Sequence, residues 1–106
     1  MSNILVNAPK TAKRGDVVEI KALIMHPMET GFRPGPNGRI IPRNIIERFT
    51  ATWNGAEIFA MDMSPAIAAN PFVSFFARAN DSGTVVLRWT GDEGFAAEHR
   101  VDIAVE

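Results

Sequence analysis

One short stretch decides the fold of this chain: Arg48-Phe49-Thr50-Ala51-Thr52-Trp53-Asn54-Gly55. Its apolar side chains alternate with polar ones, which is the pattern of a strand that buries one face. The last two residues are a strong hairpin signal, because a two-residue type I′ turn needs positive φ at both positions. The stretch therefore predicts a strand, a tight turn and a second strand at 57–63.

The same alternation recurs on both sides of this hairpin. Strands are expected at residues 4–6, 17–25, 48–53, 57–63, 72–79, 85–89 and 95–105. Turn signals lie between them, and the proline-bounded residues 64–71 read as a connection that crosses between sheets. The pattern predicts an all-β protein, an immunoglobulin-like, seven-stranded antiparallel sandwich that forms a single domain over residues 1–106.

Composition excludes several classes of function. The chain has no cysteine, so it can form neither a disulfide nor a thiolate site, and it has no tyrosine corner. Seven phenylalanines and two tryptophans must supply the core, with Trp53 expected inside. A net charge of −1 favours neither nucleic acid nor an anionic membrane, and no apolar run approaches the ~20 residues of a membrane span.

Residues 26–43 interrupt the strand pattern and begin with His26-Pro27-Met28-Glu29-Thr30-Gly31-Phe32-Arg33. Four of the seven prolines fall here, together with three glycines, so no regular ladder can run through the segment. A connection this long in a small domain is more often functional than idle. We expect it to contact another molecule, with Phe32 as the best anchor, because aromatic and arginine side chains dominate interface energies.

The ionisable residues leave alternatives open. His26, Glu29 and His99 have the ligand types of a zinc site, which would suit a small metal-dependent enzyme, although their spacing matches no known signature. Plain structural or interface roles are the expectation for both histidines, and no metal or other cofactor is predicted. Arg33 and Arg43 could bind an anion or a partner's carboxylates, or they could be ordinary surface residues whose charge is solvated by water. A free-standing ligand-binding sandwich also remains open.

Several motifs occur together in an order that resembles the SoxZ family. They are residues 9–15, the 26–32 segment, Ile41-Pro42-Arg43, Asn54-Gly55, Pro65-Ala66-Ile67-Ala68-Ala69-Asn70-Pro71, Ser82-Gly83-Thr84, Trp89 and Gly94-Phe95. The two longer segments are specific in combination, whereas the single turn motifs would mean nothing alone. The resemblance spans nearly the whole chain.

The resemblance implies a non-catalytic subunit of a carrier used in bacterial thiosulfate oxidation. SoxZ-like proteins are immunoglobulin-like sandwiches that form a heterodimer with SoxY, whose flexible arm carries sulfur on a cysteine. Enzymes such as the cytochrome SoxXA and the hydrolase SoxB then act on that arm. On this basis we expect one set of residues to contact partner proteins: His26, Met28, Glu29, Phe32, Arg33 and Arg43.

The family works in the periplasm, although residues 1–10 do not have the pattern of a signal peptide. We therefore expect export together with a signal-bearing SoxY. If the SoxY interface is left exposed in the isolated chain, we also expect two copies of the chain to form a homodimer when SoxY is absent.

Overall fold

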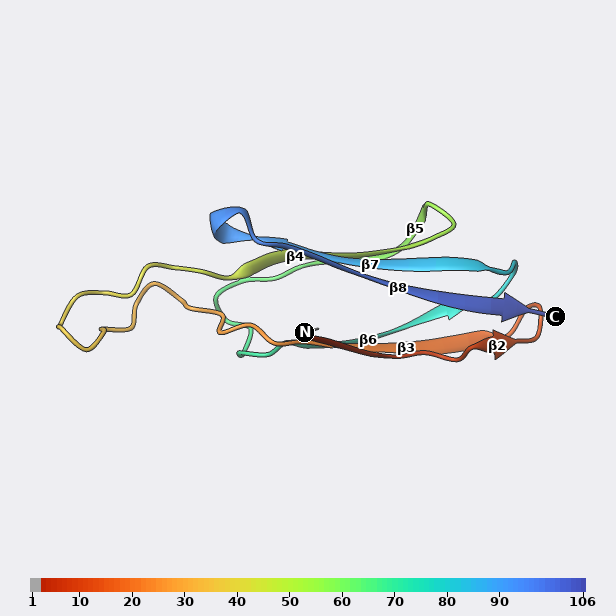
Figure 1. Cartoon of the computed structure of the whole chain (residues 1–106), viewed down its shortest axis with the longest axis horizontal. Helices are drawn as coiled ribbons and strands as arrows, with labels where there is room; N and C mark the ends of the chain where they lie inside the picture. The colour runs from red at the N-terminus through yellow and green to blue at the C-terminus, as the bar shows by residue number, and fades with distance from the viewer. Residues whose placement is uncertain (1–2) are drawn as a thin grey trace.

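Two β-sheets pack face to face in the computed structural model, which describes residues 3–106 (Figure 1). One sheet has three strands in the order β1-β3-β6, and the other has five in the order β2-β8-β7-β4-β5. The strands are β1 (Ile4–Asn7), β2 (Thr11–Ala12), β3 (Val17–Ile24), β4 (Ile46–Trp53), β5 (Ala56–Asp62), β6 (Phe72–Arg78), β7 (Gly83–Gly91) and β8 (Ala96–Val105). A short 3₁₀ turn, η1 (Asp92–Gly94), joins the last two. The predicted all-β, immunoglobulin-like sandwich is confirmed.

The structure adds one strand that the alternation pattern does not predict. β2 runs parallel to β8. The Ala104 N–H donates to the Lys10 carbonyl and the Glu106 N–H donates to the Ala12 carbonyl, each at 2.9 Å. The prediction of seven strands, all antiparallel, was therefore wrong in this detail. A two-residue strand is too short to show any alternation, and its partner lies at the far end of the chain.

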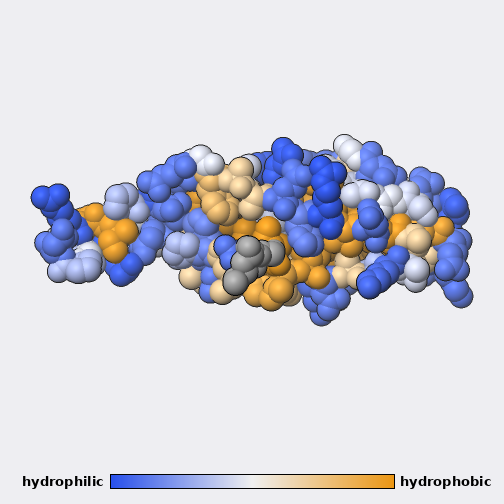
Figure 2. Space-filling model, viewed as in Figure 1, coloured by the Kyte–Doolittle hydropathy of each residue, from blue (hydrophilic) through white to orange (hydrophobic). Residues whose placement is uncertain are grey.

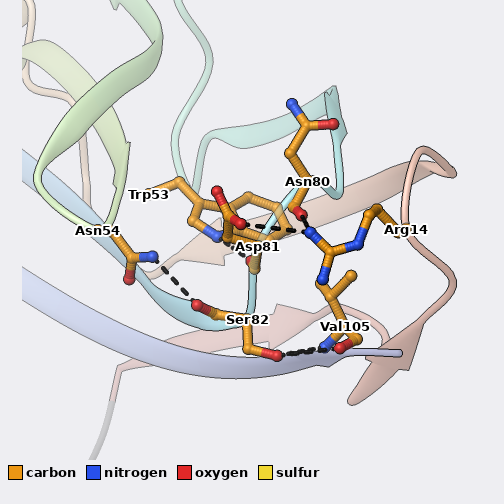
Figure 3. A network of polar contacts seen from close by, with 7 residues as sticks. All are labelled: Arg14, Trp53, Asn54, Asn80, Asp81, Ser82 and Val105. Carbon is orange, nitrogen blue, oxygen red and sulfur yellow. Dashed lines mark hydrogen bonds and ion pairs between the residues drawn. The ribbon is translucent and has the colours of Figure 1, made fainter.

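The predicted hairpin is confirmed at the turn between β4 and β5. Asn54 and Gly55 have φ of 51° and 84°, and Trp53 pairs with Ala56 across the turn. Trp53 is buried as expected, and its indole N–H donates to the carbonyl oxygen of Asp81 at 2.9 Å (Figure 3). The hairpin thus attaches to the loop between β6 and β7.

The same loop closes the end of the sandwich near the C-terminus. The Asn54 side chain donates to the Ser82 carbonyl at 3.1 Å, and the Ser82 hydroxyl accepts the Val105 N–H at 2.6 Å (Figure 3). Gly83 follows, where an added Cβ would collide with the Asn54 amide. A side chain at this position would displace the Asn54 amide from its hydrogen bonds with Ser82 and Thr84.

The core lies between the sheets and is built from aromatic side chains. Phe49 on β4 contacts Trp89 on β7 at a ring-centroid distance of 5.0 Å and Phe75 on β6 at 6.0 Å. Phe59 on β5 stacks on Phe75 at 4.8 Å. These contacts join the two sheets without a covalent link, because β6 belongs to one sheet and β4, β5 and β7 to the other.

Residues 25–45, here called the arm, project from the end opposite the C-terminus (Figure 1). The projection makes the molecule long and narrow, with extents of 58 × 24 × 19 Å. The two halves of the arm lie antiparallel but share only two isolated bridges, Glu29 with Asn44 and Pro34 with Ile40. The expected absence of a regular ladder is confirmed.

Candidate functional site

The arm begins at His26, which is buried in the body of the sandwich. Its ring packs edge-on against Phe95 at a centroid distance of 4.8 Å, and its Nδ1 accepts the N–H of Met28 at 3.0 Å. Its backbone exchanges two hydrogen bonds with Asn70, of 2.9 and 2.8 Å. Burial lowers the pKa of His26 below its ordinary 6.5, while the nearby charge of Asp92 acts in the opposite direction. His26 is therefore a neutral anchor for the start of the arm.

Met28 turns the chain outward from this anchor. It has a positive φ of 51°, a backbone conformation that is uncommon for residues other than glycine and asparagine. Its side chain is buried in the core, and its Sδ lies 3.3 Å from the donating N–H of Ile46, the first residue of β4. Burial and this contact together hold the backbone in its strained shape. Met28 thus connects both halves of the arm to the sandwich.

An ion pair stiffens the outgoing half of the arm. The Arg33 guanidinium binds the Glu29 carboxylate through two nitrogens, and Nε to Oε2 is 3.3 Å. This hydrogen bond from Arg33 lowers the pKa of Glu29 and raises that of Arg33. Glu29 also exchanges two backbone hydrogen bonds of 2.8 Å with Asn44.

A second ion pair fixes the returning half. Arg43 lies 2.8 Å from Asp92 in η1 and 3.4 Å from Glu47 on β4. Asp92 also accepts the backbone N–H of Ile45 at 3.2 Å. The hydrogen bond from Arg43 is the main reason that the pKa of Asp92 is lowered. Arg43 therefore attaches the returning half to the body, whereas the Glu29–Arg33 ion pair lies within the outgoing half.

The outer part of the arm is different, because its large apolar side chains point into solvent. Phe32 is 81% exposed and Ile40 is 57% exposed. The Ile41 N–H donates to the Arg33 carbonyl at 2.9 Å, so the two halves stay side by side out to this point. Figure 2 shows hydrophobic atoms near the end of the arm, surrounded by polar ones. We call Phe32 and Ile40 the tip of the arm.

The structure separates the six residues expected to contact partners into three groups. His26 and Met28 are buried, so they would affect a partner only through the position of the arm. Glu29, Arg33 and Arg43 form ion pairs, and of these Arg33 is the exposed one. Phe32 is exposed and available for contact.

The hypothetical zinc site does not form. His99 lies half-buried on β8, as expected from its face of the strand, whereas His26 is anchored at the base of the arm. Within residues 3–106 no group of three or more histidine and acidic residues is arranged to hold a metal ion. No helix in that range is long and apolar enough to span a membrane.

Sequence reasoning missed a second exposed apolar surface on the three-stranded sheet. Leu5 on β1 and Phe72 and Phe76 on β6 point away from the core and are 60 to 68% exposed. The signal was present in the sequence, since residues 72–76 carry phenylalanine on both faces of one strand. A strand that is apolar on both faces is typical of burial on both sides.

Comparison with known families now identifies the family. Residues 6–102 match the family model described as "Sulphur oxidation protein SoxZ". The chain belongs to the SoxZ family. A search of curated protein sequences finds no match.

Solved structures with the same fold include a sulfur carrier. The sulfur carrier protein SoxY from Chlorobium limicola f thiosulfatophilum aligns with a TM-score of 0.69 and 16% identity, over 100% of this SoxZ chain and 81% of SoxY. The superoxide reductase (neelaredoxin) from Ignicoccus hospitalis aligns with a TM-score of 0.75 and 18% identity, over 98% of this chain and 80% of the reductase. A putative superoxide reductase from Thermotoga maritima aligns at 0.74 and 18%, over 97% and 85%. At such low identity these likenesses show the fold alone.

Family membership and the SoxY likeness together support a coarse assignment. This SoxZ chain is a subunit of the Sox carrier complex of sulfur oxidation. The superoxide reductases share its sandwich, but their activity is not transferred by a shared fold.

Proposed function

We propose that this chain is the non-catalytic subunit of a SoxYZ carrier, paired with a SoxY subunit whose cysteine holds the sulfur intermediates. The observation that carries the proposal is the SoxZ family match over residues 6–102 in a chain without cysteine. Covalent sulfur carriage needs a thiolate, and this chain has none to offer. The thiol chemistry therefore belongs to the other subunit.

The arm has the features of a contact element within this complex. It is held to the body by His26, Met28 and the Arg43–Asp92 ion pair, and the Glu29–Arg33 ion pair stiffens it, which limits the entropy lost when the tip is bound. Phe32 at the tip presents an aromatic side chain to solvent, and the next residue, Arg33, is exposed as well. Exposed aromatic and arginine side chains are the residue types that dominate interface energies. We assign the tip to contacts with SoxY or with the Sox enzymes that act on it, such as SoxXA and SoxB.

The proposed compartment is the periplasm, which the chain would reach folded and bound to a signal-bearing SoxY. Deleting the SoxY gene should then leave this chain in the cytoplasmic fraction. Its appearance in the periplasm without SoxY would contradict co-export.

The central experiment is co-expression with SoxY from the same organism. A 1:1 complex should co-purify and stay together on a sizing column at micromolar concentration. The complex should be a substrate for thiosulfate-dependent sulfur loading, and this chain alone should show no turnover. Failure to bind SoxY, or turnover of a sulfur compound by this chain alone, would contradict the proposal.

A further inference from the structure

The outer face of the three-stranded sheet carries a continuous apolar row across its three strands. In the strand register Leu5 lies opposite Leu23, and Leu23 lies opposite Phe72. Val17 and Phe76 lie further along the same outer face and are more than half exposed, but Glu19, Lys21 and Ser74 separate them from this row. These residues, Leu5, Val17, Leu23, Phe72 and Phe76, are called the apolar face below.

The charged groups on this sheet are already partnered by the chain itself. Glu19 accepts a hydrogen bond of 2.7 Å from the Ser74 hydroxyl and lies 3.8 Å from the Lys21 ammonium. The Arg78 guanidinium donates to the Gly15 carbonyl at 2.7 Å. Covering a polar group is costly only when its hydrogen bonds are lost. Glu19 and Arg78 would keep these hydrogen bonds if the sheet were covered, whereas the Lys21 ammonium would need an acceptor from the partner.

The outer face of the five-stranded sheet shows the opposite character. Glu98 on β8 binds Arg88 at 2.6 Å and Arg100 at 3.0 Å. Thr84 donates to Asp102 at 2.8 Å on the same two strands. Such a surface is typical of a sheet that stays in water. The apolar face is therefore a local feature and does not reflect a generally apolar surface.

We propose that the apolar face is the surface on which the SoxY subunit sits; this inference rests on the function proposed above. Two β-sheets stack well when each offers an apolar face, at a spacing of about 10 Å. SoxY shares the sandwich fold of this chain, so it can offer a matching sheet. The partner surface would then be a sheet face that offers apolar side chains to Leu5, Leu23 and Phe72 and an acceptor to Lys21.

The size of this sheet is compatible with part of such an interface. Its strands have four, eight and seven residues, so its outer face measures roughly 25 by 15 Å. That is about half of the roughly 800 Å² per partner that a stable heterodimer buries, and the surrounding loops would supply the rest. The row of Leu5, Leu23 and Phe72 would form the dry centre, and Glu19, Lys21 and Ser74 beside it would face polar groups of SoxY.

The test compares one charge placed on each of the two outer faces. Phe76→Glu and Phe72→Glu put a carboxylate on the apolar face, and Leu5→Glu repeats the change on another strand. Thr90→Glu, at an exposed position on β7 in the other sheet, is the matched control. Each full-length variant is titrated against SoxY by calorimetry, and its thermal unfolding is recorded beside it.

The expected result is a loss of SoxY affinity of ~100-fold or more in at least two apolar-face variants. The SoxY affinity of Thr90→Glu should stay within about 3-fold of the wild-type affinity, which is a smaller change than the loss of one hot-spot residue causes. A variant with reduced thermal stability is set aside, and the other two decide.

Three results would contradict either this inference or the proposed function, and each one identifies which of the two is wrong. If the wild type binds SoxY and all folded variants bind equally well, the apolar face is not the interface, although the proposed function stands. If the variants lose only self-association of the isolated chain, the face joins two copies of this chain, and the inference is wrong. If the wild type does not bind SoxY at all, the proposed function itself is contradicted.

Discussion

The base of the arm, where His26 and Met28 are buried, and its tip at Phe32 and Ile40 are held in opposite ways, although Met28 and Phe32 lie close together in the sequence. At the base, buried side chains and ion pairs attach both halves to the sandwich, as His26, Met28 and Asp92 show. At the tip, the side chains of Phe32 and Ile40 point into solvent, and only the backbone is held, by the Thr30 hydroxyl at Phe32 and by the bridge with Pro34 at Ile40. Stability and recognition are therefore carried by different parts of one segment. Changes at the base should alter folding, and changes at the tip should alter binding.

The largest effect is expected from Met28→Ala at the base. The change leaves a cavity in the core and removes the sulfur that faces the Ile46 N–H, so the free energy of unfolding should fall by about 2 to 4 kcal/mol. Met25→Ala is the matched control, because Met25 is 52% exposed, and it should cost under about 0.5 kcal/mol. Urea unfolding of both variants measures the difference. Equal losses would show that the base is not a special anchor.

A smaller effect, visible as a pH dependence, is expected at His26. Its pKa is lowered in the folded state by burial, so the unfolded state binds more protons below pH 6.5. Stability should therefore be full above pH 6.5 and should fall as the pH drops through the window below it. Protonation would also place a proton on Nδ1, which accepts the Met28 N–H. The carboxylates of Glu29 and Asp92 lose their contributions in a separate window, below their ordinary pKa values of 4.5 and 3.8.

His26→Asn sharpens this prediction, because the asparagine oxygen can still accept the Met28 N–H but does not titrate. Urea unfolding of both proteins from pH 7.5 to 5.5 is the measurement. The variant should show a flatter dependence than the wild type. Identical slopes would mean that His26 does not link protonation to the attachment of the arm.

The smallest effect on stability is expected at the tip. Phe32→Ala and Arg33→Ala should change the free energy of unfolding by less than about 0.5 kcal/mol, because both side chains are exposed. They should nevertheless weaken complex formation with SoxY or slow sulfur oxidation by the reconstituted Sox enzymes. Wild-type affinity and wild-type turnover in both variants would remove the tip from the mechanism.

Local signals in the sequence were enough for most of the fold. The hairpin at Asn54-Gly55 was predictable because its turn conformation depends on two adjacent residues. The burial of Trp53 followed from strand alternation. The parallel pairing of β2 with β8 was not predictable, since it joins residues 11–12 to residues 104–105 and leaves no pattern in either stretch.

The candidate site was predictable only in part. The proline-rich segment and its exposed Phe32 could be identified from composition, but the inward position of Met28 could not. That position depends on a positive φ and on the Ile46 N–H eighteen residues later. The apolar face could have been found from the phenylalanines at 72 and 76, whereas its continuation to Leu5 depends on the strand order. Long-range pairing accounts for what the sequence alone did not show.

The prolines of the arm have a consequence for solubility. A projecting ribbon with free N–H groups would invite strands from other molecules and could seed cross-β aggregates. Pro27, Pro34, Pro36 and Pro42 remove donors on both halves of the arm. The protein can therefore extend a long antiparallel projection into a crowded compartment without templating fibrils.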